Sequence, residues 1–123
     1  MNKLQTALLV NAIFSSLSGI ALIVGNQQVA QLFGTTNTTV FWIIGGVLIF
    51  FAATIGYEIF KQRSWAVLWI IAQDFLWVIG SIVLLIWNPF EISQIGLAVI
   101  GVVALIVLYM GVNQASALSK SVN

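Results

Sequence analysis

Four long apolar stretches, separated by short polar breaks, run along almost the whole chain. A helix needs about 20 mostly apolar residues to cross the hydrocarbon core of a membrane, and each stretch has about that length. The pattern therefore predicts four membrane-spanning helices, at roughly 4–25, 40–60, 65–87 and 94–114. The fold class that follows is all-α: an integral membrane, four-helix transmembrane bundle that forms one domain over residues 1–123.

The first predicted outer loop is longer than a turn. Within it, the segment 29–33 is a candidate for a short helix at the membrane interface. Such a helix would either cover an outward cavity as a lid or, the interpretation we favour, rest on the bilayer.

The composition favours lipid over water as the solvent. Of the 123 residues, 61% are hydrophobic and 6% are charged, whereas soluble domains carry about 25% charged residues. The chain has no cysteine and no histidine, which excludes disulfides, thiolate metal sites and the most common general base. We expect no cofactor, no metal site, no nucleic-acid partner and no enzymatic activity.

The basic residues give the chain a direction in the membrane. Lys3, Lys61, Arg63 and Lys120 all fall on one side of a four-span arrangement, and the opposite loops hold only the acid Glu91. Basic residues are retained in the cytoplasm, so we expect both termini on the cytoplasmic side of a bacterial plasma (inner) membrane. The first stretch also resembles a secretory signal peptide, but it is long for one, and we expect it to remain as a helix.

One carboxylate, Asp74, lies deep inside the third predicted span. At 1.5 Å per residue it is about 13 Å from the cytoplasmic end of that span. An aspartate near the centre of a span costs about 2.5–3.5 kcal/mol on insertion scales. No lysine or arginine is expected at that depth. We therefore expect a protonated acid that donates a hydrogen bond to Asn11 or Gln73.

Polar side chains of the other predicted spans fall at a similar depth, so that every helix would contribute to one polar slab. By the same rise these side chains are Asn11, Ser15, Thr54 and Tyr109. Trp77, one turn from Asp74, adds an aromatic face of the kind that binds organic cations. The predicted ligand-binding residues are Asp74, Asn11, Gln73, Trp77, Ser15 and Tyr109.

Two functions fit this cluster. The first is a small membrane protein that transports or binds a small cationic or protonated solute through Asp74. The alternative is a non-catalytic accessory or scaffold subunit of a larger membrane complex, in which Asp74 holds helices together. A cavity that reaches Asp74 from the cytoplasm would favour the first function, and a fully packed Asp74 the second.

The expected partners are the lipid bilayer and either a second copy of the chain or another membrane protein. In size and number of spans the chain looks like the small multidrug-resistance exporters, which work as dimers. That family carries its essential acid in the first span, where this chain has Asn11, so the resemblance ends at size and span number.

Small residues are spaced so that helices can approach closely. Gly45, Ala52 and Gly56 follow one face of the second predicted span, and Gly101, Ala104 and Gly111 follow one face of the fourth.

An internal repeat is also suggested by the sequence. An offset of 62 residues places the third span on the first, with Asn11 on Gln73, and would divide the protein into two similar hairpins. Glu58, near the end of the second span, is expected to pair with Lys61 or to remain solvated.

Overall fold

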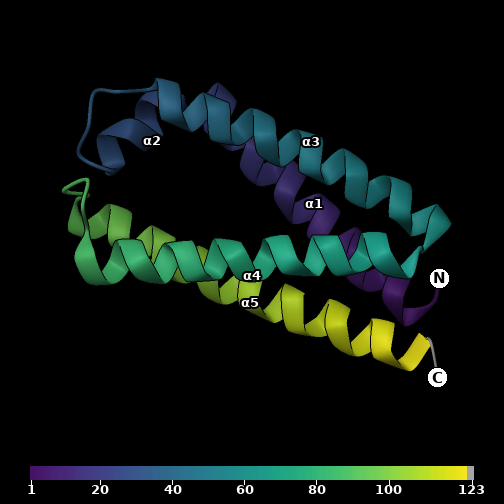
Figure 1. The fold of residues 1–123 in the computed structure, drawn as a ribbon. Coiled ribbons are helices and arrows are strands. Elements are labelled where there is room, and N and C mark those ends of the chain that lie inside the picture. The colour runs from purple at the N-terminus through teal and green to yellow at the C-terminus, as the bar shows by residue number, and fades with distance from the viewer. Residues whose placement is uncertain (122–123) are drawn as a thin grey trace.

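Five helices make up the described part of the chain, residues 1–121 of the computed structural model. Four of them are long and apolar enough to cross a membrane, and a short helix lies between the first two (Figure 1). The helices are α1 (Lys3–Val24), α2 (Asn26–Leu32), α3 (Thr39–Lys61), α4 (Ser64–Trp87) and α5 (Gln94–Ser121). No strand occurs within residues 1–121. The predicted class, an all-α bundle of four membrane-spanning helices, is confirmed.

The predicted boundaries of the first three spans agree with α1, α3 and α4 to within one residue. The fourth helix is longer than the predicted span 94–114, because α5 continues to Ser121. Beyond 114, Ala117 and Leu118 turn inward and join a hydrophobic core with Leu4 and Leu8 of α1. This burial stabilises the last turns of α5 in spite of their polar composition. Residues 122 and 123 of the predicted domain 1–123 lie outside the described residues.

The helix ends follow from local backbone chemistry. At the start of α1, Asn2 Oδ1 accepts from the Gln5 backbone N–H (2.8 Å), and Gln5 Oε1 accepts from the Asn2 N–H (3.1 Å). This reciprocal pair is a capping box. Beyond α3 and α4, Gln62 (φ 50°) and Asn88 (φ 42°) adopt the left-handed conformation that ends a helix. Pro89, which follows Asn88, cannot continue the helix.

The long helices pack as two pairs. α1 lies along α3, α4 lies along α5, and α1 also packs against α5 and so joins the pairs. α3 and α4 are consecutive in the chain but share only a few contacts. In Figure 1 the pairs lie close together where α1 begins and α5 ends, and they diverge toward α2.

Glycines allow α1 and α3 to touch through their backbones. A Cβ atom on Gly45 would lie 2.7 Å from the Gly19 carbonyl oxygen, and a Cβ on Gly19 would lie 2.7 Å from that of Gly45. Of the small face predicted for α3, Gly45 and Ala52 are buried, whereas Gly56 faces open space. The α1–α3 contact therefore depends on the first part of that face.

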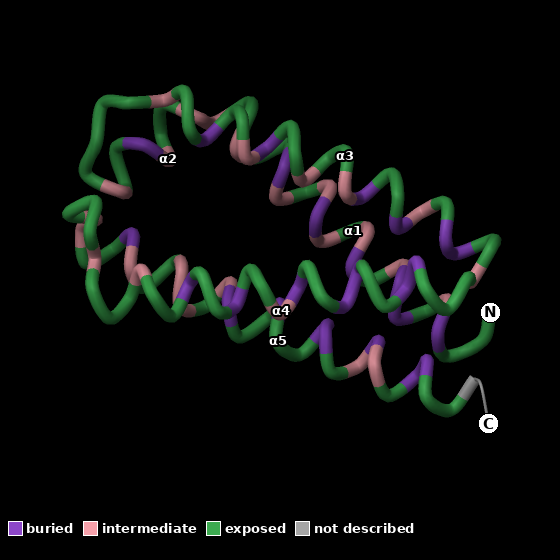
Figure 2. Tube along the Cα trace, in the orientation of Figure 1, coloured by how far each residue is buried: buried purple, intermediate pink, exposed green. Residues whose placement is uncertain are grey.

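The hydrophobic core is concentrated at the end of the bundle near the start of α1 and the end of α5 (Figure 2). All four long helices contribute to it, with Leu8, Ile55, Val67 and Leu118 among the buried side chains. This end of the bundle is therefore closed by apolar packing.

At the other end, α2 links the two pairs. The Ser93 backbone N–H donates to the Phe33 carbonyl oxygen (3.1 Å), and the Ser93 hydroxyl donates to the carbonyl oxygen of Leu32. Gly96, at the start of α5, lies against Phe33, since a Cβ there would be 3.1 Å from Phe33 Cα. The short helix predicted at 29–33 is present, although it occupies Asn26–Leu32.

The two helix pairs repeat the same pattern of buried positions. Buried residues of α1 have buried counterparts in α4 at a separation of 63 residues, the separation of Asn11 and Asp74. These pairs are Leu4 and Val67, Ala7 and Ile70, Leu8 and Ile71, Asn11 and Asp74, and Ser15 and Val78. Between α3 and α5 the separation is 59 residues, and the buried pairs include Gly45 and Ala104, Ala52 and Gly111, and Ile55 and Gln114. The predicted offset of 62 is wrong by one residue, because it places buried Asn11 on exposed Gln73.

Candidate ligand-binding site

Asp74 is held inside the bundle by hydrogen bonds to α1 and α5. Its Oδ2 accepts from Asn11 Nδ2 (2.9 Å) and from Gln114 Nε2 (2.6 Å). Asn11 Nδ2 also donates to Gln114 Oε1 (2.9 Å), and Ser15 Oγ donates to Asn11 Oδ1 (3.0 Å). All four side chains are buried. We call Asn11, Ser15, Asp74 and Gln114 the Asp74 cluster; it connects three of the four long helices.

The hydrogen bond expected from Asp74 to Asn11 runs in the opposite direction. Since Ser15 occupies the Asn11 amide oxygen, the Asn11 NH₂ group is the part that faces the carboxyl. Of the two partners expected for Asp74, Asn11 is confirmed and Gln73 is not, because Gln73 is exposed and its side chain makes no hydrogen bond to Asp74.

The second carboxyl oxygen of Asp74 is available to a ligand. Both hydrogen bonds to the carboxyl end on Oδ2, and Oδ1 accepts none from any residue within 1–121. No enclosed side-chain nitrogen or oxygen in the same residues lacks a partner. Oδ1 is therefore not enclosed, and Asp74 is one of the residues that line a cavity.

This cavity has a volume of about 270 Å³ and is lined by all four long helices. Its walls are mostly apolar and include Phe14, Phe51, Val107 and Met110. Drug-sized pockets are about 300–1,000 Å³ and combine apolar walls with a few polar groups. The cavity fits a smaller molecule, and Asp74 supplies its one acidic group among the residues described.

The cavity lies on the α2 side of Asp74. Along α1 its lining runs from Asn11 to Ser18, away from the start of the helix, and along α4 it runs from Gln73 to Trp77. The opposite side of Asp74 is occupied by the hydrophobic core. A cavity is present, as the solute-binding function requires, but it does not approach Asp74 from the end where α1 begins.

Five of the six predicted site residues line the cavity, namely Asp74, Asn11, Gln73, Trp77 and Ser15. The sixth, Tyr109, does not, and 66% of its surface is exposed on the outside of α5.

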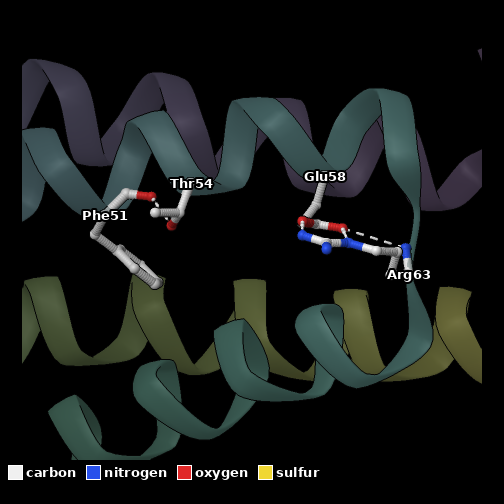
Figure 3. Close-up of polar contacts among 4 residues, drawn as sticks. All are labelled: Phe51, Thr54, Glu58 and Arg63. Atoms are coloured by element: carbon white, nitrogen blue, oxygen red, sulfur yellow. Dashed lines mark hydrogen bonds and ion pairs between the residues drawn. The ribbon is translucent and has the colours of Figure 1, made fainter.

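The predicted polar slab is also wrong for α3, because Thr54 is exposed and its hydroxyl donates to the Phe51 carbonyl oxygen of the same helix (2.7 Å; Figure 3). α3 contributes no side chain to the Asp74 cluster.

Gln114 is the functional residue that the sequence analysis missed. It is fully buried, and it bonds both Asp74 and Asn11. Gln114 does not line the cavity, so it holds the Asp74 carboxyl through Oδ2 without contacting a ligand in the cavity. The sequence analysis ended the fourth span at 114 and assigned this glutamine no role.

A second polar group, outside the cavity, fixes the turn between α3 and α4. Buried Glu58 accepts from Arg63 Nε (3.2 Å), from the Arg63 backbone N–H (3.2 Å) and from Arg63 Nη2 (Figure 3). The expectation that Glu58 pairs with Lys61 or is solvated is wrong. The guanidinium also stacks on Tyr57 and Trp65, at 5.2 and 4.7 Å from the ring centroids. The hydrogen bond to Glu58 raises the pKa of Arg63 above its ordinary value. This pair is a structural element of the turn.

No group of three metal-ligating side chains occurs among the described residues. Comparisons with known protein families, curated proteins and solved structures find no match to this chain. The four apolar helices identify the class as an integral membrane protein with a four-helix transmembrane bundle. The function proposed next rests on the residues of the cavity.

Proposed function

We propose that this protein binds a small cationic or protonated solute in the cavity beside Asp74, and that it transports this solute across a bacterial plasma membrane with both termini in the cytoplasm. The observation that carries the proposal is the accessible Oδ1 of a buried carboxyl in a mostly apolar cavity. Carboxyl groups inside membrane spans face the bundle interior and mark solute or proton pathways.

The surroundings of Asp74 favour a cation over an anion or a neutral polar solute. The two amide donors on Oδ2 partly compensate a negative charge, so Oδ1 remains to accept an N–H donor from a ligand. The aromatic rings of Phe14, Phe51 and Trp77 line the same space, and ring faces attract ammonium groups. Within residues 1–120, no basic side chain lines the cavity to compete for Asp74.

The direct test is an amine titration of the purified protein in lipid nanodiscs, followed by tryptophan fluorescence. 4-Phenylbutylamine serves as the cation and 4-phenylbutanol as its neutral analogue. We expect Asp74→Asn to weaken amine binding at least about tenfold, because a charge-assisted hydrogen bond is lost, and to leave alcohol binding unchanged.

Tyr109→Phe is the matched control, since this side chain lies outside the cavity, and we expect it to bind the amine like the parent. Equal amine affinity in the parent and in Asp74→Asn would contradict the proposal. Uptake of the amine by proteoliposomes then tests transport separately from binding.

A second function, that of an accessory or scaffold subunit in a larger membrane complex, is favoured by the hydrogen bonds of the Asp74 cluster. They connect α1, α4 and α5 and leave no enclosed polar side-chain atom unpaired within residues 1–121. If this is the function, the parent binds no amine, and Asp74→Asn lowers the stability of the bundle by about 1–2 kcal/mol. Amine binding by the parent therefore separates the two functions, because the loss of stability in Asp74→Asn is expected under both.

A further inference from the structure

The helix contacts around the cavity differ in extent. α1 packs along α3, α4 packs along α5, and α1 packs against α5. Only a few contacts join α3 to α4. The gap between α3 and α4, where contacts are sparse, is therefore the candidate for an opening from the cavity to the side of the bundle.

The residues on both sides of this gap are lining residues of the cavity and are also exposed on the outer surface. On α3, Val47 lines the cavity and is 61% exposed. On α4, Trp77 lines the cavity and is 38% exposed, and Gln73 is exposed as well. Side chains that belong to the cavity wall and to the outer surface at the same time define the rim of an opening.

The repeated burial pattern shows which contact the gap replaces. The repeat matches α1 to α4 and α3 to α5. The contact of α1 with α5 therefore corresponds to the contact of α4 with α3. The first is packed and the second is sparse. The bundle is thus asymmetric, and its sparse contact lies beside Val47 and Trp77, which line the cavity and are exposed.

We infer that the solute enters sideways from the bilayer, through a portal between α3 and α4 bounded by Val47, Phe51 and Trp77. This inference rests on the proposed function and names the class of its ligand: amines with an apolar body, which dissolve in the membrane. At the end where α1 begins, the hydrophobic core separates Asp74 from the surface. At the level of the portal, both helices belong to membrane-spanning segments, so the rim faces acyl chains.

The ligand chemistry follows from the route. A hydrocarbon body gains little on moving from lipid into an apolar cavity, because the two surroundings are alike. The ammonium group gains the Asp74 carboxyl and the ring faces that lipid cannot offer. Selectivity for charge is therefore expected, and strongly hydrated cations without an apolar body are expected to be excluded.

The test is kinetic and uses the full chain in nanodiscs. Val47→Trp narrows the portal, and Ile43→Trp is the matched control, one turn earlier on α3, half exposed and outside the cavity lining. Binding and release of 4-phenylbutylamine are followed by stopped-flow fluorescence. We expect Val47→Trp to slow both rates by about tenfold, with the affinity changed much less, and Ile43→Trp to match the parent. Val47→Phe is a second, smaller plug in case the tryptophan variant does not fold.

The outcomes separate this inference from the proposed function. Asp74-dependent binding with unchanged rates in Val47→Trp and Val47→Phe would overturn the lateral portal and leave the proposed function intact. Competition by methylammonium as strong as by 4-phenylbutylamine would overturn the lipid-dissolved class of ligand. If the parent binds no amine, both proposals fail.

Discussion

Two adjacent glycines on α3 offer a sharp test of how the bundle is assembled. Gly45 is buried against α1, whereas Gly46 is exposed and has no atom within 4 Å of the position that its Cβ would take. We expect Gly45→Ala to destabilise the protein relative to Gly46→Ala. The second variant is the matched control, because the two differ only in what the new methyl group meets.

The size of the effect follows from the contacts at Gly45. An added Cβ would lie 2.7 Å from the Gly19 carbonyl oxygen and 2.8 Å from Ile23 Cγ1. The carbonyl belongs to the backbone of α1 and cannot turn away as a flexible side chain does. Overpacking of this kind costs about 1–3 kcal/mol. Both substitutions gain up to about 1 kcal/mol of helix propensity, which cancels in the comparison.

The expected difference in unfolding free energy is therefore about 1–3 kcal/mol, at the upper part of the range if α1 cannot move. Unfolding by sodium dodecyl sulfate in mixed micelles, followed by circular dichroism, measures it. We expect Gly46→Ala to be as stable as the parent or more so. A Gly45→Ala protein at least as stable as Gly46→Ala would refute the backbone contact between α1 and α3.

Two further predictions concern the polar groups of the fold. Gln114→Leu removes two hydrogen bonds of the Asp74 cluster. At about 0.6 kcal/mol per bond in membrane proteins, this should lower the unfolding free energy by about 1 kcal/mol in the same assay. Ser116→Leu, on the exposed face of α5, is the control and should not lower it measurably. Glu58→Gln removes the charge that Arg63 binds and should lower the unfolding free energy by about 1–2 kcal/mol, since one partner is buried and the other is partly exposed. Glu91→Gln, at an exposed acid, is its control, and equal stability of the two variants would contradict a structural role for the ion pair.

The spans could be read from the sequence because the bilayer leaves the chain few alternatives. Backbone groups in hydrocarbon must be paired within the helix, so about 20 apolar residues in a row specify a helix of known length. Polar interruptions then locate the turns, as Gln62 and Asn88 do with their left-handed backbones. The partner of Glu58 was not predictable in the same way, because Lys61 and Arg63 are both within reach in sequence. The turn geometry at Gln62 selects Arg63.

Asp74 was identified from its depth, but Tyr109 and not Gln114 was predicted at the site, because α5 carries only apolar side chains besides Tyr109 from Ile95 to Val112. Without a polar face, hydropathy does not show which side of such a helix points inward. The small-residue face of α5 contained the missing information. Gln114 follows Gly111 by three residues, so it lies on that same face and is buried. Tyr109 does not lie on that face and is exposed.

The portal between α3 and α4 was not predictable from the sequence at all, for a related physical reason. Val47 contacts lipid on one side and the cavity on the other, and both surroundings are apolar, so no residue type distinguishes the two. The repeated burial pattern would predict equal contacts for α1–α5 and α3–α4, since equivalent residues face them. Closing the second contact as tightly as the first would press Phe51 toward α4 and remove the space beside Asp74. The asymmetry of the bundle is therefore the feature that creates the cavity, and it becomes visible only when the helices are placed in space.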